Sequence, residues 1–170
     1  MKMKKNSTKI LVTLALLVSV GMLLSYVEHL LPPLGAVPGV KIGLANIASV
    51  FALYVLGARC AVAVSALRVL LSALLFGNVL GLLYSASGAA CALIGMCLVK
   101  RLRLFSAVGV SVVGGVLHNV AQIVAASLVM RTHSLVLFYL PTLLISGTLA
   151  GVLIGLASGL LVERLRGKIK

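Results

Sequence analysis

The chain has 170 residues, of which 62% are hydrophobic and only 10% are charged. A soluble domain carries about 25% charged residues, so this chain has too little polar surface to cover a globule, and we expect an integral membrane protein. Its only acidic residues are Glu28 and Glu163, and Asp is absent. This composition excludes paired carboxylates for acid–base catalysis, Asp-rich Mg²⁺ sites and Ser-His-Asp triads within the chain.

The net charge of +13 comes from short Lys and Arg clusters that lie between apolar runs. Such clusters indicate membrane topology and not a nucleic-acid groove. Cys60, Cys91 and Cys97 stand singly in apolar segments, without a CxxC motif or a histidine at metal-ligand spacing, so we interpret them as packing residues. We therefore expect no metal, no cofactor and no nucleic-acid partner.

Apolar runs recur along the chain at the length of about 20 residues that a membrane helix needs. They predict an all-α bundle of six transmembrane helices at 10–31, 42–56, 59–76, 79–99, 104–130 and 135–162, forming a single membrane domain over residues 1–170. The first run exceeds the roughly 7–15 apolar residues of a signal peptide and lacks an A-x-A site, which favours a retained span. The second and third runs are short, and a single re-entrant element is the alternative there.

The Lys and Arg distribution predicts the orientation of these spans, because cytoplasmic loops carry the excess of basic residues. With the N-terminus in the cytoplasm, only Lys41 and Arg131 fall on the outer face, and Arg68 lies within the third span. The remaining basic residues fall on the inner face: Lys2, Lys4, Lys5, Lys9, Arg59, Lys100, Arg101, Arg103, Arg164, Arg166, Lys168 and Lys170. We expect a multi-pass protein of the cytoplasmic (inner) membrane with both termini cytoplasmic.

The fifth span carries three polar side chains, His118, Asn119 and Gln122, in a long uncharged run. At about 100° per residue, His118 and Gln122 share a narrow stripe with Ser111 and Gly115, and Asn119 lies at its edge. Such side chains often bond to neighbouring helices at about 0.6 kcal/mol each or somewhat more. The alternative is a stripe that lines a ligand cavity open to the outside.

Arg68 lies near the middle of the third span, where an arginine costs about 2.5–3.5 kcal/mol on insertion scales. We place Glu28 near the outer end of the first span, away from this depth. Arg68 is therefore expected to use backbone carbonyls, water or an anionic ligand. At the entry to the second span, Lys41 and Asn46 either mark the membrane boundary or attract an anionic ligand to the mouth of a cavity.

Small residues recur at four-residue spacing in two spans. Gly147, Gly151, Gly155 and Gly159 allow another helix to approach backbone to backbone, whether from this chain or from a partner. In the first span, Ala15 with Ser19 and Gly21 with Ser25 could dock a second protein or pack within the bundle.

The run "PGVKIGLANIASVFALYVLGARCAVAVSALRVLLSALLFGN" (38–78), with the Gly- and Ser-rich span after it, resembles the Gx transporter family, also named heptaprenyl diphosphate synthase component I. The resemblance covers nearly the whole chain, and "PGVKIGLAN" is its most specific part. More distantly, six spans with both ends inside resemble the substrate-binding S-components of energy-coupling factor transporters. That resemblance implies a bound small molecule, a membrane coupling protein and two cytoplasmic ATPases.

The S-component resemblance also implies roles for particular residues. A lid at 32–41 would close a ligand pocket surrounded by Asn78, Tyr84, Ser85, His118, Asn119, Gln122 and Arg131. S-components usually carry an Ala-xxx-Ala docking pair in the first span, and this chain has Ala15 with Ser19. The chain lacks a nucleotide-binding loop, so ATP would be hydrolysed by a partner.

Two functions follow, neither of them catalytic within this chain. The first is capture of a small molecule, such as a vitamin or cofactor precursor, and its delivery to the energising partners; a ligand with an anionic end held by Arg68 is one alternative. The second is an accessory membrane component of heptaprenyl diphosphate or isoprenoid quinone synthesis, because prenyl elongation requires Asp-rich Mg²⁺ motifs that this chain lacks. A non-transporting scaffold is a third alternative, and it predicts no cavity beside His118, Asn119 and Gln122.

Overall fold

The computed structural model describes residues 2–30, 43–77, 79–132 and 134–169, and all the regular elements in them are helices. The six helices are α1 (Lys2–Leu30), α2 (Asn46–Val55), α3 (Ala58–Phe76), α4 (Val79–Leu102), α5 (Ala107–Met130) and α6 (Ser134–Ile169). This confirms the predicted all-α fold. Five helices, all except α2, are long and apolar enough to cross a membrane.

The second predicted span is shorter in the structure than in the prediction. A helix was expected over 42–56, but α2 has 10 residues and begins only at Asn46. At 1.5 Å per residue it is about 15 Å long, which is half the thickness of a bilayer core. The delay has a local cause, because Gly43 has a φ of 77° and forms a turn before the helix. The predicted re-entrant alternative joined this segment to the third span, but α2 and α3 are separate helices with Gly57, at a φ of 98°, between them.

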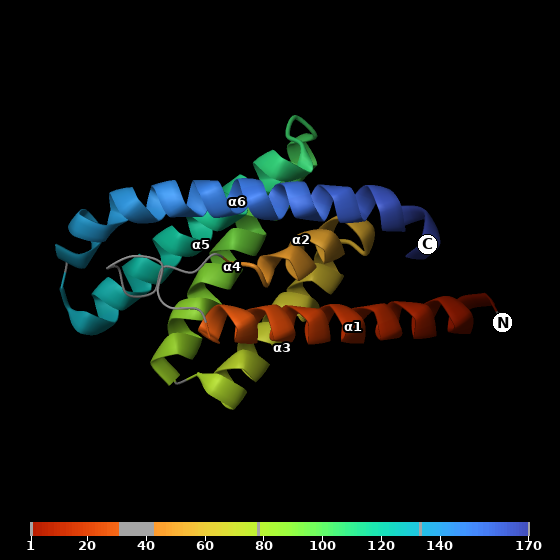
Figure 1. Cartoon of the computed structure of the whole chain (residues 1–170), viewed down its shortest axis with the longest axis horizontal. Coiled ribbons are helices and arrows are strands. Elements are labelled where there is room, and N and C mark those ends of the chain that lie inside the picture. Colours follow the sequence, from red (N-terminus) through yellow and green to blue (C-terminus); the bar gives the residue numbers. More distant parts are fainter. Residues whose placement is uncertain (1, 31–42, 78, 133, 170) are drawn as a thin grey trace.

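The two ends of the chain lie at the same end of the bundle (Figure 1). α1 and α6 run along the length of the molecule in opposite directions, and α3 and α4 cross it at a tilt. Lys100, in the last turn of α4, donates a hydrogen bond to the carbonyl of Leu53 near the end of α2. The C-terminal ends of α2 and α4 are therefore adjacent. Although α2 is short, it brings the chain back to the side of the bundle where α4 ends, and α3 begins on that side.

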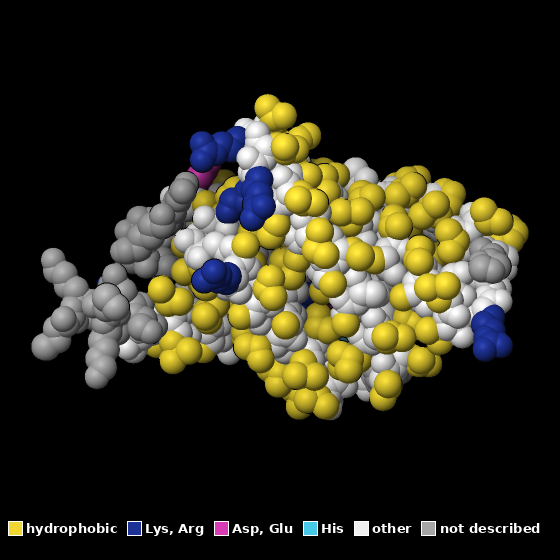
Figure 2. All heavy atoms as spheres, turned by 180° about the vertical axis from the view of Figure 1, so that it is seen from behind, with side chains coloured by type: hydrophobic (Ala, Val, Ile, Leu, Met, Phe, Trp, Pro, Cys, Tyr) yellow, Lys and Arg dark blue, Asp and Glu magenta, His cyan; other side chains and the backbone are white. Residues whose placement is uncertain are grey.

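The surface has the pattern of a protein embedded in lipid. In Figure 2, apolar side chains cover the middle of the molecule, and Lys and Arg side chains lie towards its ends. Large apolar residues such as Leu16, Leu74 and Leu153 are each more than 60% exposed. An exposed apolar surface of this extent would be unstable in water, but in a bilayer it faces lipid tails.

Glycines hold α5 and α6 close together. A Cβ added at Gly151 would lie 2.5 Å from Cα of Val112, and one at Gly155 would lie 2.6 Å from Cα of Val108. A Cβ at Gly115 would lie 2.5 Å from the carbonyl oxygen of Gly147. The partner of the glycine stripe is therefore a helix of the same chain. Gly159 lies outside the tight contact, since its added Cβ would be 3.9 Å from the nearest atom.

The most buried element is the shortest one. Seven of the ten residues of α2 are buried: Ala48, Ser49, Val50, Phe51, Ala52, Leu53 and Val55. α2 packs against α1, α3 and α6, and its apolar residues form the centre of the core together with Ala61, Val64 and Ile154. The continuous apolar run at 42–56, which predicted a membrane span, is thus explained by the burial of α2 within the protein.

Candidate ligand-binding cavity

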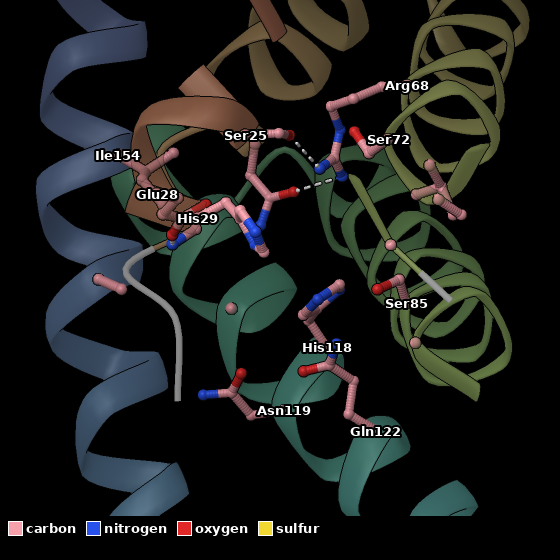
Figure 3. A pocket seen from close by; sticks show the side chains of 18 of the residues that line it. Ser25, Glu28, His29, Arg68, Ser72, Ser85, His118, Asn119, Gln122 and Ile154 are labelled. Atoms are coloured by element: carbon pink, nitrogen blue, oxygen red, sulfur yellow. Dashed lines mark hydrogen bonds between the residues drawn. The ribbon is translucent and has the colours of Figure 1, made fainter. Parts of the chain in front are cut away.

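A cavity of about 320 Å³ lies within the bundle, and all six helices or the turns before them contribute polar and apolar residues to its wall. Ligand pockets in proteins typically have volumes of about 300–1,000 Å³. Its lining residues are Ser25, Glu28, His29, Gly43, Asn46, Arg68, Val69, Ser72, Ala73, Phe76, Gly77, Gly81, Ser85, Gly115, His118, Asn119, Gln122, Gly147, Ala150 and Ile154. Figure 3 shows the labelled polar side chains converging on this space from different helices.

Arg68 projects into the cavity from α3 and rests on α1. Its Cδ would lie 3.1 Å from a Cβ at Gly21, so the glycine leaves room for the aliphatic part of the arginine. The guanidinium donates hydrogen bonds from Nη1 to Ser25 Oγ at 3.4 Å and from Nη2 to Asn46 Oδ1 at 3.2 Å (Figure 3). The Gly21–Ser25 face therefore accommodates an arginine of this chain.

The guanidinium is incompletely bonded. A guanidinium has five N–H donors, and among the described residues two hydrogen bonds are formed by Arg68, both to neutral oxygens at long distances. Nε is buried and has no hydrogen-bond partner within the described part of the chain. In a medium of low dielectric constant, a charged group with so few hydrogen-bond partners is costly. The charge of Glu28 acts on Arg68 and offsets part of this cost, and the buried Nε leaves a donor for a further acceptor in the cavity.

The expected separation of Glu28 from Arg68 is wrong, because both residues line the same cavity. Glu28 Oε1 accepts hydrogen bonds from the backbone N–H groups of Gly43 and of Leu44, the latter at 3.3 Å. A Cβ on Gly43 would lie 3.4 Å from Ile154 Cδ1. Ile154 is near the middle of the apolar part of α6, Val136–Leu165. Glu28 is near the end of α1, as expected, but it lines the same cavity as Arg68 and its charge acts on the guanidinium.

His118 and Gln122 face the cavity from α5 and pack against α4 at Gly88. A Cβ on Gly88 would lie 2.8 Å from Gln122 Cγ and 2.9 Å from the His118 ring atoms Cε1 and Nδ1. The missing side chain at this position allows both residues to lie between α4 and α5 (Figure 3). Gly88 was not identified from the sequence as part of the site.

Asn119 has a different environment from its two neighbours. It is only 6% exposed, and its Nδ2 donates to the carbonyl of Leu143 at 3.0 Å and to Ser146 Oγ at 3.4 Å, both on α6. This is the interhelical bonding that the first interpretation of the stripe predicted. Asn119 therefore belongs to the α5–α6 contact as well as to the cavity wall.

Of the other predicted ligand residues, some line the cavity and others do not. Asn46 and Ser85 line the cavity. Tyr84 and Arg131 do not line it; Tyr84 has a buried hydroxyl without a partner in the described ranges, and Arg131 is exposed after the end of α5. Lys41, Asn78 and the predicted lid at 32–41 lie outside the described residues.

The predicted docking pair is on the outside of the bundle. Ala15 and Ser19 are both exposed on α1, and Ser19 Oγ donates to the carbonyl of Ala15 at 2.9 Å. The face is therefore available to lipid or to another protein.

Several cavity residues were missed because their positions depend on how the helices pack. Ser72, His29 and Phe76 meet near the ends of α1 and α3, where the His29 and Phe76 ring centroids are 5.6 Å apart. Among the missed residues, Ser25 had the clearest indication in the sequence, because it forms a small-residue pair with Gly21. Glu28 carried another, because it is one of only two acidic residues in the chain.

The helices and the cavity together define a multi-pass membrane protein with an internal cavity lined by both polar and apolar groups. The chain belongs to the family described as heptaprenyl diphosphate synthase component I, whose model matches residues 17–161. This is the family named by the sequence resemblance. Searches of curated proteins and of solved structures found no match.

Proposed function

We propose that this protein captures a small, water-soluble anion in the cavity and delivers it to a membrane coupling protein energised by cytoplasmic ATPases. The observation that supports this best is Arg68, a buried cation whose Nε has no partner among the described residues, in the wall of a cavity of ligand size. Arginine donors match the geometry of carboxylate and phosphate oxygens. His118, Gln122 and Ser85 supply further hydrogen-bonding groups for the rest of such a ligand.

The position of the cavity supports uptake from outside. With the N-terminus in the cytoplasm, α1, α3 and α5 run outward, and the cavity is lined by Ser25–His29 near the end of α1 and by Arg68–Gly77 in the second half of α3. The proposed site therefore lies in the outer half of the bundle. A scaffold without a cavity is not supported by this geometry.

A second candidate is an accessory role in heptaprenyl diphosphate synthesis, which is favoured by the family to which the chain belongs. In that case an isoprenoid would occupy the cavity, with its diphosphate near Arg68 and its chain directed towards lipid. A synthase activity would require a partner, because the chain has no Asp and only two acidic residues to hold Mg²⁺.

Native mass spectrometry of the detergent-purified protein tests these two proposals. We expect a stoichiometric water-soluble anion on the wild-type protein, its loss from Arg68→Gln and its retention by Arg131→Gln. Arg131 is a matched control, because it carries the same charge outside the cavity. A prenyl diphosphate or a quinone released from the wild-type protein would instead support the accessory role, and equal retention by both variants would contradict binding at Arg68.

A further inference from the structure

Helix α2 is held at both ends by charged side chains from other helices. At its start, the N–H groups of Gly43 and Leu44 donate to the carboxylate of Glu28 on α1. At its end, the ammonium group of Lys100 on α4 donates to the carbonyl of Leu53 and lies 4.6 Å from the centroid of the Tyr54 ring.

Of these two contacts, only that of Lys100 satisfies a group of the helix itself. Glu28 binds the turn before α2, and the carbonyls of Gly43 and Leu44 in that turn accept from the first N–H groups of the helix, those of Asn46 and Ile47. Ala45, at the N-cap position of α2, makes no side-chain capping bond. The first N–H groups and last C=O groups of any helix lack partners within it, and the buried surroundings of α2 offer little water to satisfy them. A negative group at the N-terminus and a positive group at the C-terminus also complement the helix dipole. Glu28 and Lys100 have this arrangement.

The start of α2 is part of the cavity wall. Asn46 is the first residue of the helix, lines the cavity and accepts a hydrogen bond from Arg68. The helix is about 15 Å long, so a contact at its far end fixes where Asn46 lies along the helix axis. A shift of α2 towards or away from Lys100 would change the distance between Asn46 and the guanidinium of Arg68.

We propose that Lys100 is a positioning residue for the cavity, although it does not line the cavity itself. Lys100 binds the C-terminal end of α2, and Glu28 binds the turn at the other end. Together these contacts keep Asn46 within hydrogen-bonding distance of Arg68. The inference deepens the proposed function, since it concerns the same cavity. It makes the geometry of a ligand site in the outer half of the bundle dependent on a lysine in the last turn of α4, where the chain approaches the inner face.

Hydrogen–deuterium exchange on the ligand-free, full-length protein tests this inference. The variants are Lys100→Met, Lys100→Arg and Arg101→Met. Arg101 is the matched control, because it is the next residue, carries the same charge and is exposed. We expect Lys100→Met to accelerate exchange by a similar factor at amides 53–57 and at amides 43–47, while Lys100→Arg largely restores protection and Arg101→Met leaves it unchanged.

Three outcomes would overturn the inference. Faster exchange confined to 53–57 would mean that Lys100 acts only on its own end of the helix. Unchanged exchange throughout α2 would mean that the contact holds nothing in place. Equal acceleration in the α5–α6 contact, at 147–155, would indicate general destabilisation. Because no ligand is present in the measurement, its result is independent of whether the proposed transport function is correct.

Discussion

The polar residues of α5 fall into two rows, each with four-residue spacing. Ser111, Gly115 and Asn119 face α6, where Gly147, Gly151 and Gly155 receive them. His118 and Gln122 form the other row, which faces α4 and the cavity. The sequence predicted one stripe with two alternative roles. In the structure the first row packs against α6, and the second row lies against α4 and lines the cavity. Adjacent residues on a helix point about 100° apart, which explains how His118 and Asn119 come to differ.

This division gives different expected effects for substitutions at neighbouring positions. His118→Ala and Gln122→Ala are expected to weaken binding of the co-purifying ligand with little change in unfolding. Asn119→Ala is expected to lower the free energy of unfolding by about 0.6–1.7 kcal/mol, because it removes a hydrogen bond between helices. Ligand titration and unfolding in denaturing detergent measure the two effects. Loss of the folded protein in the first two variants would support a purely structural role for all three residues.

Arg68 shows what could and could not be predicted about the site. Its depth in the span follows from counting residues, and so does its need for an unusual partner. The identity of the neighbouring residues does not follow, because Ser25 and Asn46 are 43 and 22 residues away in the chain. Glu28 was placed too far away because the turn at Gly43, which brings α2 to the carboxylate, depends on the backbone of one residue.

At the scale of helices, α5 and α6 can pack closely because glycines, which have no side chain, lie where the two helices touch. The four-residue glycine spacing predicted such a contact from the sequence alone, although it left the partner open. The partner is α5 because that helix carries Gly115 at the closest approach, opposite Gly147. The same spacing continues to Gly159, where the helices have separated enough for a side chain to fit.

Substitution by alanine distinguishes the two ends of this stripe. Gly151→Ala is expected to destabilise the fold by about 1–3 kcal/mol, because the new methyl group meets the backbone of Val112 at 2.5 Å and the helices must separate. Gly159→Ala is expected to be neutral or slightly stabilising, since its nearest atom is 3.9 Å away and alanine favours helix. Unfolding of the purified variants measures both. Equal effects at the two positions would contradict this account of the contact.

Helix α2 illustrates the limit of hydropathy as a predictor of spans. Its apolar run is continuous, so composition alone cannot separate a short helix buried in protein from a longer helix exposed to lipid. The length of the segment was the one indication that it does not cross the membrane, since 42–56 is shorter than the roughly 20 residues of a typical span. The charged groups near its two ends belong to α1 and α4, so their contacts with the turn before α2 and with its last residues can be recognised only once the fold is known.

For the molecule as a whole, the number of helices and the all-α class were predicted correctly from apolar runs. The common position of the two termini in the bundle agrees with an even number of passes (Figure 1). Which end faces the cytoplasm stays a prediction based on Lys and Arg counts. The cavity could not be predicted as a volume, because its wall is assembled from side chains of all six helices and the turns before them.

Reporter fusions test the orientation. A fluorescent protein that folds only in the cytoplasm is expected to be bright when fused after Lys170, and alkaline phosphatase is expected to be active when inserted after Arg131. The expectation rests on the excess of basic residues on the side of the termini. The opposite pattern at both positions would contradict this orientation. It would mean that both termini are outside and that the cavity lies in the inner half of the membrane.

The short helix also has a consequence for the order in which the protein assembles during synthesis. Glu28 emerges from the ribosome before α2, so the acceptor for the amides of Gly43 and Leu44, in the turn before the helix, is already present. Lys100 follows α2 by more than 40 residues, and the carbonyls at the end of the helix have no lysine until α4 has been made. An isolated helix of this length is marginal on its own. We therefore expect α2 to enter its final position late, after α3 and α4 have formed the space around it.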